Sequence, residues 1–210
     1  MSSAKYWIVL VAILASMYTS FVAFRKFQQI QQTTASAGVG GATTPVTFPD
    51  TPVPPFTLTD QNDQPFDSKS LEGKVWVGSF FFVSCPSICW RMNQALADLQ
   101  LSAPGDEVRY ISMTCDPDTD TPEVLSHYAE KLKADPARWT FLTGGLPEIQ
   151  TVGHSLLVAV EKNTHSSKAI VVDRTGRVRG QFNVTEPDQL QKLTKLLAEL
   201  VKENEKVAGG

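Results

Sequence analysis

The sequence has few of the features that identify common classes of protein. It contains only 3 cysteines among 210 residues, too few for a disulfide-stapled scaffold. Its net charge of −3 includes no excess of Lys and Arg, so the composition predicts no nucleic-acid partner. It also lacks a phosphate-binding loop, Gly-x-Ser-x-Gly and His-Glu-x-x-His, which excludes the catalytic sites built on those motifs. The cysteines are therefore the first residues to consider for chemistry.

One long uncharged run is present, over residues 6–24. A helix of about 20 apolar residues spans a bilayer, so we expect residues 1–26 to be a membrane anchor. A cleaved signal peptide is the alternative, with residues 35–37 as a poor and distant cleavage site. The positive charges that flank the run are nearly balanced, so they do not decide its orientation.

The rest of the chain divides by composition. Residues 27–55 are rich in Gln, then in Thr, Ser, Ala and Gly, and finally in Pro, which is typical of a linker. Residues 56–202 are long enough to bury one core and are predicted to form a single domain. Residues 203–210 are polar and are expected to form a frayed tail.

Within the domain, strand and helix patterns alternate. A small hairpin is predicted around the turn at residues 60–63. Further strands are predicted at 75–83, 108–113, 139–142, 157–160, 169–172 and 178–182. Helices are predicted at 86–101, 122–132, from 147, and at 186–201. This alternation followed by a hairpin predicts an α/β sandwich on a mixed sheet.

Two of the cysteines form the motif Cys85-Pro-Ser-Ile-Cys89, directly after the apolar strand at 75–83. Pro86 suits the first position of a helix, which would place Cys85 at the helix cap and Cys89 one turn along on the same face. The positive end of the helix dipole is expected to lower the pKa of a thiol there. Such a pair forms either a metal site or a redox site.

The spacing mildly favours metal. Helical residues four apart have Cβ atoms about 5–6 Å apart, whereas a relaxed disulfide requires about 3.5–4.5 Å. A metal ion bound to both sulfurs tolerates the wider gap. Because the first turn of a helix distorts easily, both readings stay open, as does a third in which the two cysteines are buried structural residues.

Three segments of the sequence resemble the SCO/SenC family of thioredoxin-like copper proteins that serve cytochrome c oxidase assembly. They are Phe-Val-Ser-Cys-Pro-Ser-Ile-Cys at 82–89, Ile-Ser-Met-Thr-Cys-Asp-Pro-Asp-Thr-Asp-Thr-Pro-Glu at 111–123, and Thr-His-Ser at 164–166 followed by Ile-Val-Val-Asp-Arg-Thr-Gly at 170–176. The resemblance covers residues 56–200, and the anchor and linker match the usual layout of the family.

The resemblance implies a thioredoxin-like fold and a copper site of Cys85, Cys89 and His165. Cu(I) is a soft ion that two thiolates and an imidazole suit, and the sequence leaves open whether Cu(II) is also bound. Considered alone, His165 is typical of an exposed loop histidine. His127 and His154 lie in or near predicted helices and are interpreted as ordinary surface or packing residues.

Two positions depart from the family pattern. Trp90 stands where many members have Pro after the second cysteine, and Cys115 stands where an apolar residue usually precedes Asp-Pro. Cys115 is either a buried apolar substitute or a third thiol able to form a disulfide or a further metal bond. Asp116 could orient a ligand or cap the following helix.

The resemblance implies a metallochaperone that is tethered to the cytoplasmic membrane by one helix, with its soluble domain on the extracytoplasmic side. Its partner would be cytochrome c oxidase subunit II or another copper acceptor, whose cysteines it could also reduce by thiol–disulfide exchange. The alternative is a thiol–disulfide oxidoreductase or thiol peroxidase, with Cys85 as nucleophile and Cys89 or Cys115 as resolving thiol. A copper or redox sensor is a third class.

Overall fold

The computed structural model describes residues 18, 20, 21, 25, 48–102, 108–163 and 166–207. The chain divides into two units, residues 1–47 and 48–210. Most of the expected anchor lies outside the described residues, and among those described no helix is long and apolar enough to cross a membrane. The end of the expected linker, residues 48–55, belongs to the second unit, because Phe48 and Val53 pack against its core.

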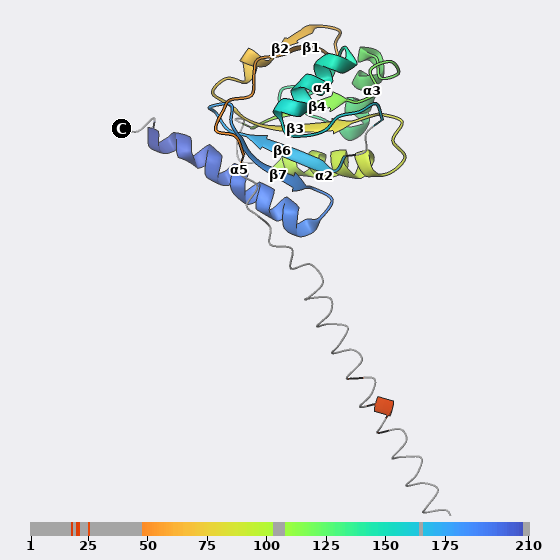
Figure 1. Ribbon diagram of the computed structural model, residues 1–210, viewed down its shortest axis with the longest axis vertical. Helices are drawn as coiled ribbons and strands as arrows, with labels where there is room; N and C mark the ends of the chain where they lie inside the picture. The colour runs from red at the N-terminus through yellow and green to blue at the C-terminus, as the bar shows by residue number, and fades with distance from the viewer. Residues whose placement is uncertain are drawn as a thin grey trace, which may run out of the picture. The chain divides into compact units, whose positions relative to one another are not determined.

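Seven strands of the described chain form one mixed sheet in the order β2-β1-β5-β4-β3-β6-β7 (Figure 1). The strands are β1 (Thr57–Asp60), β2 (Pro65–Asp67), β3 (Val75–Phe81), β4 (Val108–Thr114), β5 (Trp139–Thr143), β6 (Lys168–Val172) and β7 (Val178–Asn183). The three central strands β3, β4 and β5 are parallel, and the remaining pairings are antiparallel. The mixed thioredoxin-like sheet expected from the sequence is confirmed.

Helices cover both faces of this sheet. They are α2 (Ile88–Ser102), α3 (Pro122–Leu132), α4 (Leu146–Ser155) and α5 (Pro187–Val207), with a 3-10 helix, η1 (Ser68–Leu71), before β3. Apolar residues of α2, α3 and α5 pack in one core layer, and those of α4 pack in the other. Figure 1 shows α4 on one side of β3 and β6, and α2 and α5 on the other. Helix α5 continues into the segment expected as a polar tail.

The central strand β3 is buried along its whole length. Because successive side chains point to opposite faces of a sheet, Val75, Val77 and Phe81 enter one core layer while Trp76 and Phe80 enter the other. The apolar run that predicted this strand is therefore the signature of a strand with both faces covered. Its carboxyl end leads directly to the cysteine motif.

Helix α3 begins and ends where its sequence signals predict. Thr121 caps the first turn by accepting a hydrogen bond from the Val124 N–H at 3.4 Å, and Pro122 occupies the first turn, where no backbone donor is needed. Lys133 ends the helix in the left-handed conformation, with φ of 54°. These local signals fix the helix that covers the strand ends beside the cysteine motif.

The strand predicted at residues 157–160 is wrong. Leu157 has φ of 59°, a turn conformation, and the Val158 N–H donates to the Gly153 carbonyl at 2.8 Å. The segment therefore folds back against α4 and does not join the sheet. Gly153 permits this close approach, because a Cβ there would lie 2.4 Å from the Val160 Cγ2. Val158 and Val160 of this apolar run are buried in the core layer of α4, and a short apolar run does not reveal whether a helix or a sheet covers it.

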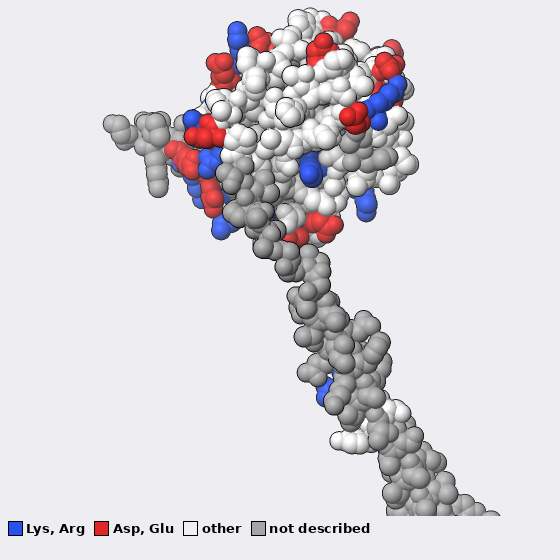
Figure 2. Space-filling model, in the orientation of Figure 1, with Lys and Arg blue, Asp and Glu red and all other residues white. Residues whose placement is uncertain are grey.

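Charges of both signs are scattered over the face of the domain shown in Figure 2. Acidic and basic side chains lie interspersed near its edges, and its middle is mostly uncharged. The described residues of this face therefore present no extended patch of a single sign.

Candidate metal centre

The cysteine motif forms a tight turn followed by the start of α2. The Cys85 N–H donates to the Phe82 carbonyl at 3.2 Å, which closes a turn directly after β3. The helix begins at Ile88, and the Arg91 N–H makes a helical hydrogen bond to the Ser87 carbonyl at 3.1 Å. The prediction that Pro86 starts the helix is therefore two residues early. Cys85 lies in the loop and Cys89 in the first turn of the helix.

The structure nonetheless brings the two cysteines together. The Cys89 N–H donates to the Cys85 Sγ at 3.4 Å, so the Cys85 sulfur lies at the amino end of α2. Neither cysteine forms a disulfide in the structure; Cys89 is fully buried and Cys85 is only 6% exposed. The small exposed fraction of Cys85 marks the side from which an ion or a second protein can reach the pair.

Burial, rather than the helix dipole, controls the Cys89 thiol. Loss of water, together with a hydrogen bond with Cys85, raises the pKa of Cys89 to about 12. For Cys89, the expected lowering of the pKa by the helix dipole is therefore wrong. A thiol with such a pKa is protonated at neutral pH, and a metal ion that binds it must displace the proton.

His165 and the neighbouring Thr164 lie outside the described residues. The residues that flank them both contact the cysteine region. The Asn163 N–H donates to the Cys115 carbonyl at 3.2 Å, and a hydrogen bond from the Ser166 backbone lowers the pKa of Cys89. Ser166 is itself buried. The loop that carries His165 therefore meets the cysteine region on both sides of the two undescribed residues.

The other two histidines are placed by the helices that carry them. The His127 Nδ1 lies 2.8 Å from the Glu123 carbonyl one turn earlier in α3, and His154 lies in the last turn of α4. Among the described residues, no group of three or more His, Cys, Asp or Glu side chains is arranged to hold a metal ion. The three cysteines therefore do not form a site by themselves.

Cys115 faces the core layer opposite to that of Cys85 and Cys89. It is fully buried with Met113, Ile149 and other apolar residues. Loss of water, together with electrostatic repulsion from Cys89 and Asp120, raises the pKa of Cys115 to about 12. Its surroundings are those of a small apolar side chain, and nothing in its position offers it as a ligand beside Cys85.

Asp116 does not cap α3, since Thr121 does so. Its carboxylate lies 3.6 Å from the Lys162 Nζ, and Asp118 lies 2.6 Å from the same ammonium group. Its backbone carbonyl accepts hydrogen bonds from Thr119 and Asp120. The acidic loop after β4 is thus tied to the loop that precedes His165.

An aromatic cluster beneath the motif was not predicted. Tyr128 stacks on Phe81 with ring centroids 5.2 Å apart, and its hydroxyl accepts a hydrogen bond from the buried Asn93 amide at 3.0 Å. Trp90 meets Tyr128 edge-on at 5.9 Å and is 38% exposed. No pattern in the sequence indicated that these residues meet beside the cysteines.

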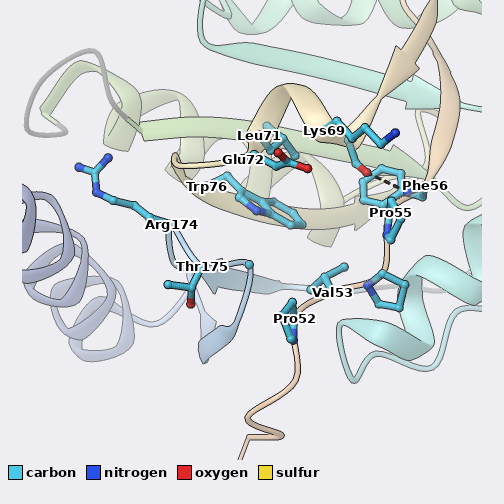
Figure 3. Close-up of a pocket in the computed structure, with 13 residues that line it drawn as sticks. Pro52, Val53, Pro55, Phe56, Lys69, Leu71, Glu72, Trp76, Arg174 and Thr175 are labelled. Carbon is cyan, nitrogen blue, oxygen red and sulfur yellow. Dashed lines mark hydrogen bonds between the residues drawn. The ribbon is translucent and has the colours of Figure 1, made fainter.

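A groove of about 820 Å³ runs along α3 beside this cluster, lined by Val83, Val124, His127 and Tyr128 among others. A second hollow, of about 370 Å³, lies at the amino end of β3 (Figure 3). Its lining includes Trp76, Leu71 and Arg174, together with the Pro-rich segment at 52–55. Because the cysteines follow the carboxyl end of β3, this second hollow is separate from the candidate metal centre.

Comparison with known proteins agrees with this geometry. The SCO1/SenC family matches residues 45–202. The SCO1 protein homolog of Bacillus subtilis is 33% identical over 144 residues, which cover 64% of this chain and 75% of the relative. Solved structures of the same family match with similar coverage.

One such structure is BsSco, a member of the Sco family of cytochrome c oxidase assembly proteins with a disulfide switch. It matches with a TM-score of 0.63 and 27% identity over 72% of this chain and 96% of BsSco. Yeast Sco1 with copper bound matches with a TM-score of 0.60 and 26% identity over 73% of this chain and 94% of that structure. The family match spans the domain from the segment before β1 into α5. This chain belongs to the SCO1/SenC family.

Proposed function

We propose that this chain is a copper-binding metallochaperone for the assembly of the binuclear copper centre of cytochrome c oxidase subunit II. The observation that carries the proposal is the pair of buried cysteines at the tip of the central strand, which form no disulfide and in which the Cys89 N–H donates a hydrogen bond to the Cys85 sulfur. Membership of the SCO1/SenC family supports it, as does copper in the structure of yeast Sco1.

The proposed ligands are Cys85, Cys89 and His165. Thiolates and imidazole are the soft and borderline donors that copper takes from proteins. Burial of the sulfurs excludes water, while the small exposed edge of Cys85 leaves an approach for an acceptor. The contact of the Ser166 backbone with Cys89 supports His165 as the third ligand, because it brings the residue next to His165 to one of the two sulfurs.

The same two thiols can carry a redox role. A disulfide between Cys85 and Cys89 cannot bind Cu(I) as two thiolates, so oxidation would prevent binding. The copper-free dithiol can also reduce a disulfide in the target. In that exchange Cys85 and Cys89 become a disulfide, and the disulfide of the target becomes two thiols. The disulfide switch of BsSco supports this second role.

A dedicated thiol oxidoreductase or peroxidase is the weaker reading. The thiolate is the reactive form of cysteine, and burial raises the pKa of both candidate resolving thiols, Cys89 and Cys115, to about 12. Such a mechanism would also give no role to His165. These observations favour a metal site over a fast thiol enzyme.

We further propose that residues 1–26 anchor the chain in the cytoplasmic membrane, with the domain on the extracytoplasmic side. The uncharged run at 6–24 supports this arrangement, because its length suits a membrane-spanning helix. Protease accessibility of the domain in intact spheroplasts tests it, with a cytoplasmic protein as control. Protection of the domain until the membrane is lysed would contradict the proposal.

Transfer of copper tests the function directly. The copper-loaded chain is mixed under anaerobic conditions with the copper-free, reduced soluble domain of subunit II, and the two are separated for metal analysis. We expect copper to move to subunit II and the binuclear centre to appear in the absorption spectrum. Copper that stays with the chain, together with normal oxidase assembly in a deletion strain, would contradict the proposal and favour a sensor.

A variant of His165 separates the copper chaperone from the thiol oxidoreductase or peroxidase. We expect His165→Ala to lower copper affinity strongly while leaving the reactivity of the thiols nearly intact. His127→Ala is the matched control, because that ring lies on α3 and bonds to its own helix. Unchanged copper binding in His165→Ala would remove the residue from the ligand set.

A further inference from the structure

Asp120 is a buried acidic residue whose position packing does not explain. It is 1% exposed, and its Oδ1 atom makes no hydrogen bond. Lys162 pairs with the two other acidic residues of the same loop, Asp116 and Asp118. Burying a carboxylate without a cation is costly. An apolar residue would fill the space at lower cost. The role of the carboxylate must therefore lie in the hydrogen bonds that it makes.

Those hydrogen bonds converge on one oxygen. The Asp120 Oδ2 accepts from the Val83 N–H at 3.0 Å and from the Thr114 hydroxyl at 2.5 Å. Val83 lies in the turn that carries Cys85, and Thr114 is the last residue of β4. The carboxylate, which is 37 residues from Val83 in sequence, therefore joins the cysteine turn to the end of the neighbouring strand.

The Thr114 hydroxyl is held in a single orientation. Its proton goes to Asp120, and its oxygen accepts the Asp116 N–H at 2.9 Å. The Asp120 N–H in turn donates to the Asp116 carbonyl at 2.9 Å. These bonds make the loop after β4 a fixed frame, so the carboxylate meets Val83 from a rigid base rather than from a mobile loop.

Other roles for Asp120 are filled by other residues. Thr121 caps α3, and Lys162 pairs with the two other acids of the loop. Burial raises the pKa of Asp120, whereas the hydrogen bonds from Thr114 and Val83 lower it. The same two bonds that hold the turn therefore also offset the cost of burying the carboxylate.

We propose that Asp120 is a positioning residue of the copper site, whose carboxylate holds the Cys85 turn against the end of β4 and so fixes where the Cys85 sulfur lies relative to Cys89. The effect of Asp120 on copper binding rests on the proposed function. The positioning of Cys85 does not, since it can be measured on the copper-free dithiol.

The test uses the full chain with Asp120→Asn, Asp120→Ala and Thr114→Val. Asn keeps an oxygen that can accept from both Val83 and Thr114, whereas Ala removes both bonds and Thr114→Val removes one. Asp173→Ala is the matched control. Its buried carboxylate accepts from the Thr175 and Arg177 N–H groups in the β6–β7 turn, at the opposite end of the sheet.

Two quantities are measured beside urea stability: the alkylation rate of Cys85 in the reduced, copper-free protein, followed by mass spectrometry, and the Cu(I) affinity. Loss of a hydrogen bond to a charged group is expected to raise the alkylation rate and lower the affinity by about tenfold each in Asp120→Ala and Thr114→Val. Asp120→Asn is expected to stay within about threefold of the parent. Asp173→Ala is expected to lose stability with neither change.

Equal alkylation rates in Asp120→Ala and Asp173→Ala, at equal stability, would overturn the proposal. Asn behaving like Ala would also overturn it, because the two hydrogen bonds would then not carry the effect. If Asp120→Ala does not fold, Thr114→Val decides. Faster Cys85 alkylation in a chain whose parent binds no copper would uphold the positioning and reject the proposed function.

Discussion

Copper binding by this chain is expected to strengthen as the pH rises. Burial raises the pKa of Cys89 to about 12, so this thiol is protonated in the copper-free protein at neutral pH. Copper binds the thiolate, and each ion that binds must therefore displace the proton. At lower pH the proton competes better and copper binds more weakly, so the copper affinity increases with pH.

The size of the effect follows from the number of protons displaced. One proton per copper gives about a tenfold gain in apparent affinity per pH unit, provided that the pH stays well below the pKa. Between about pH 6.5 and pH 8.5 Cys89 alone thus contributes about 100-fold, or ~2.7 kcal/mol. If each copper displaced a second proton, the logarithm of the apparent affinity would rise twice as steeply with pH.

The assay is an anaerobic competition titration against a chromophoric Cu(I) chelator, whose own pH dependence is measured separately. A pH indicator in weak buffer counts the protons released per copper bound. Cys115→Ala is the control and should keep the slope, because Cys115 lies in the opposite core layer. An affinity that is the same at both ends of the range, with no proton released, would refute the reasoning.

Three further predictions concern stability. Tyr128→Phe should cost about 1–3 kcal/mol in urea unfolding, because it leaves the buried Asn93 amide without the hydroxyl that accepts its hydrogen bond; an unchanged midpoint would contradict that bond. Trp90→Ala should cost about 1 kcal/mol by removing the edge contact with Tyr128, measured in the same way with the exposed Leu101→Ala as control. The copper-free fold should be most stable below about pH 9 and lose stability as the pH rises towards 12, because the unfolded chain ionises Cys89 near 9.0 while the folded chain does not; urea midpoints that rise between pH 8 and 10 would contradict this sign.

Sequence patterns were most informative where local signals and burial agree. The run at 75–83 predicted the central strand, and Pro122 predicted the start of α3. They failed at 157–160, where a short apolar run is typical of a strand but its buried residues pack in the core layer of α4. Periodicity reports that side chains are buried and does not report which element covers them.

The cysteine pair was predictable and its environment was not. Four-residue spacing after a strand was enough to bring Cys85 and Cys89 together. The helix starts later than predicted, because the Cys85 N–H donates to the Phe82 carbonyl and closes a turn before the helix. The pKa of Cys89 is raised by burial, which depends on residues distant in sequence. The role of Asp120 depends on a contact between two loops, which no spacing within either loop encodes.

The most direct test of the account is an anaerobic Cu(I) titration of the reduced chain, with metal analysis after desalting. The account predicts one retained copper per chain, lost in Cys85→Ser and Cys89→Ser, strongly weakened in His165→Ala and unchanged in Cys115→Ala. No retained copper in the parent chain, with rapid turnover of a disulfide or peroxide substrate instead, would contradict it.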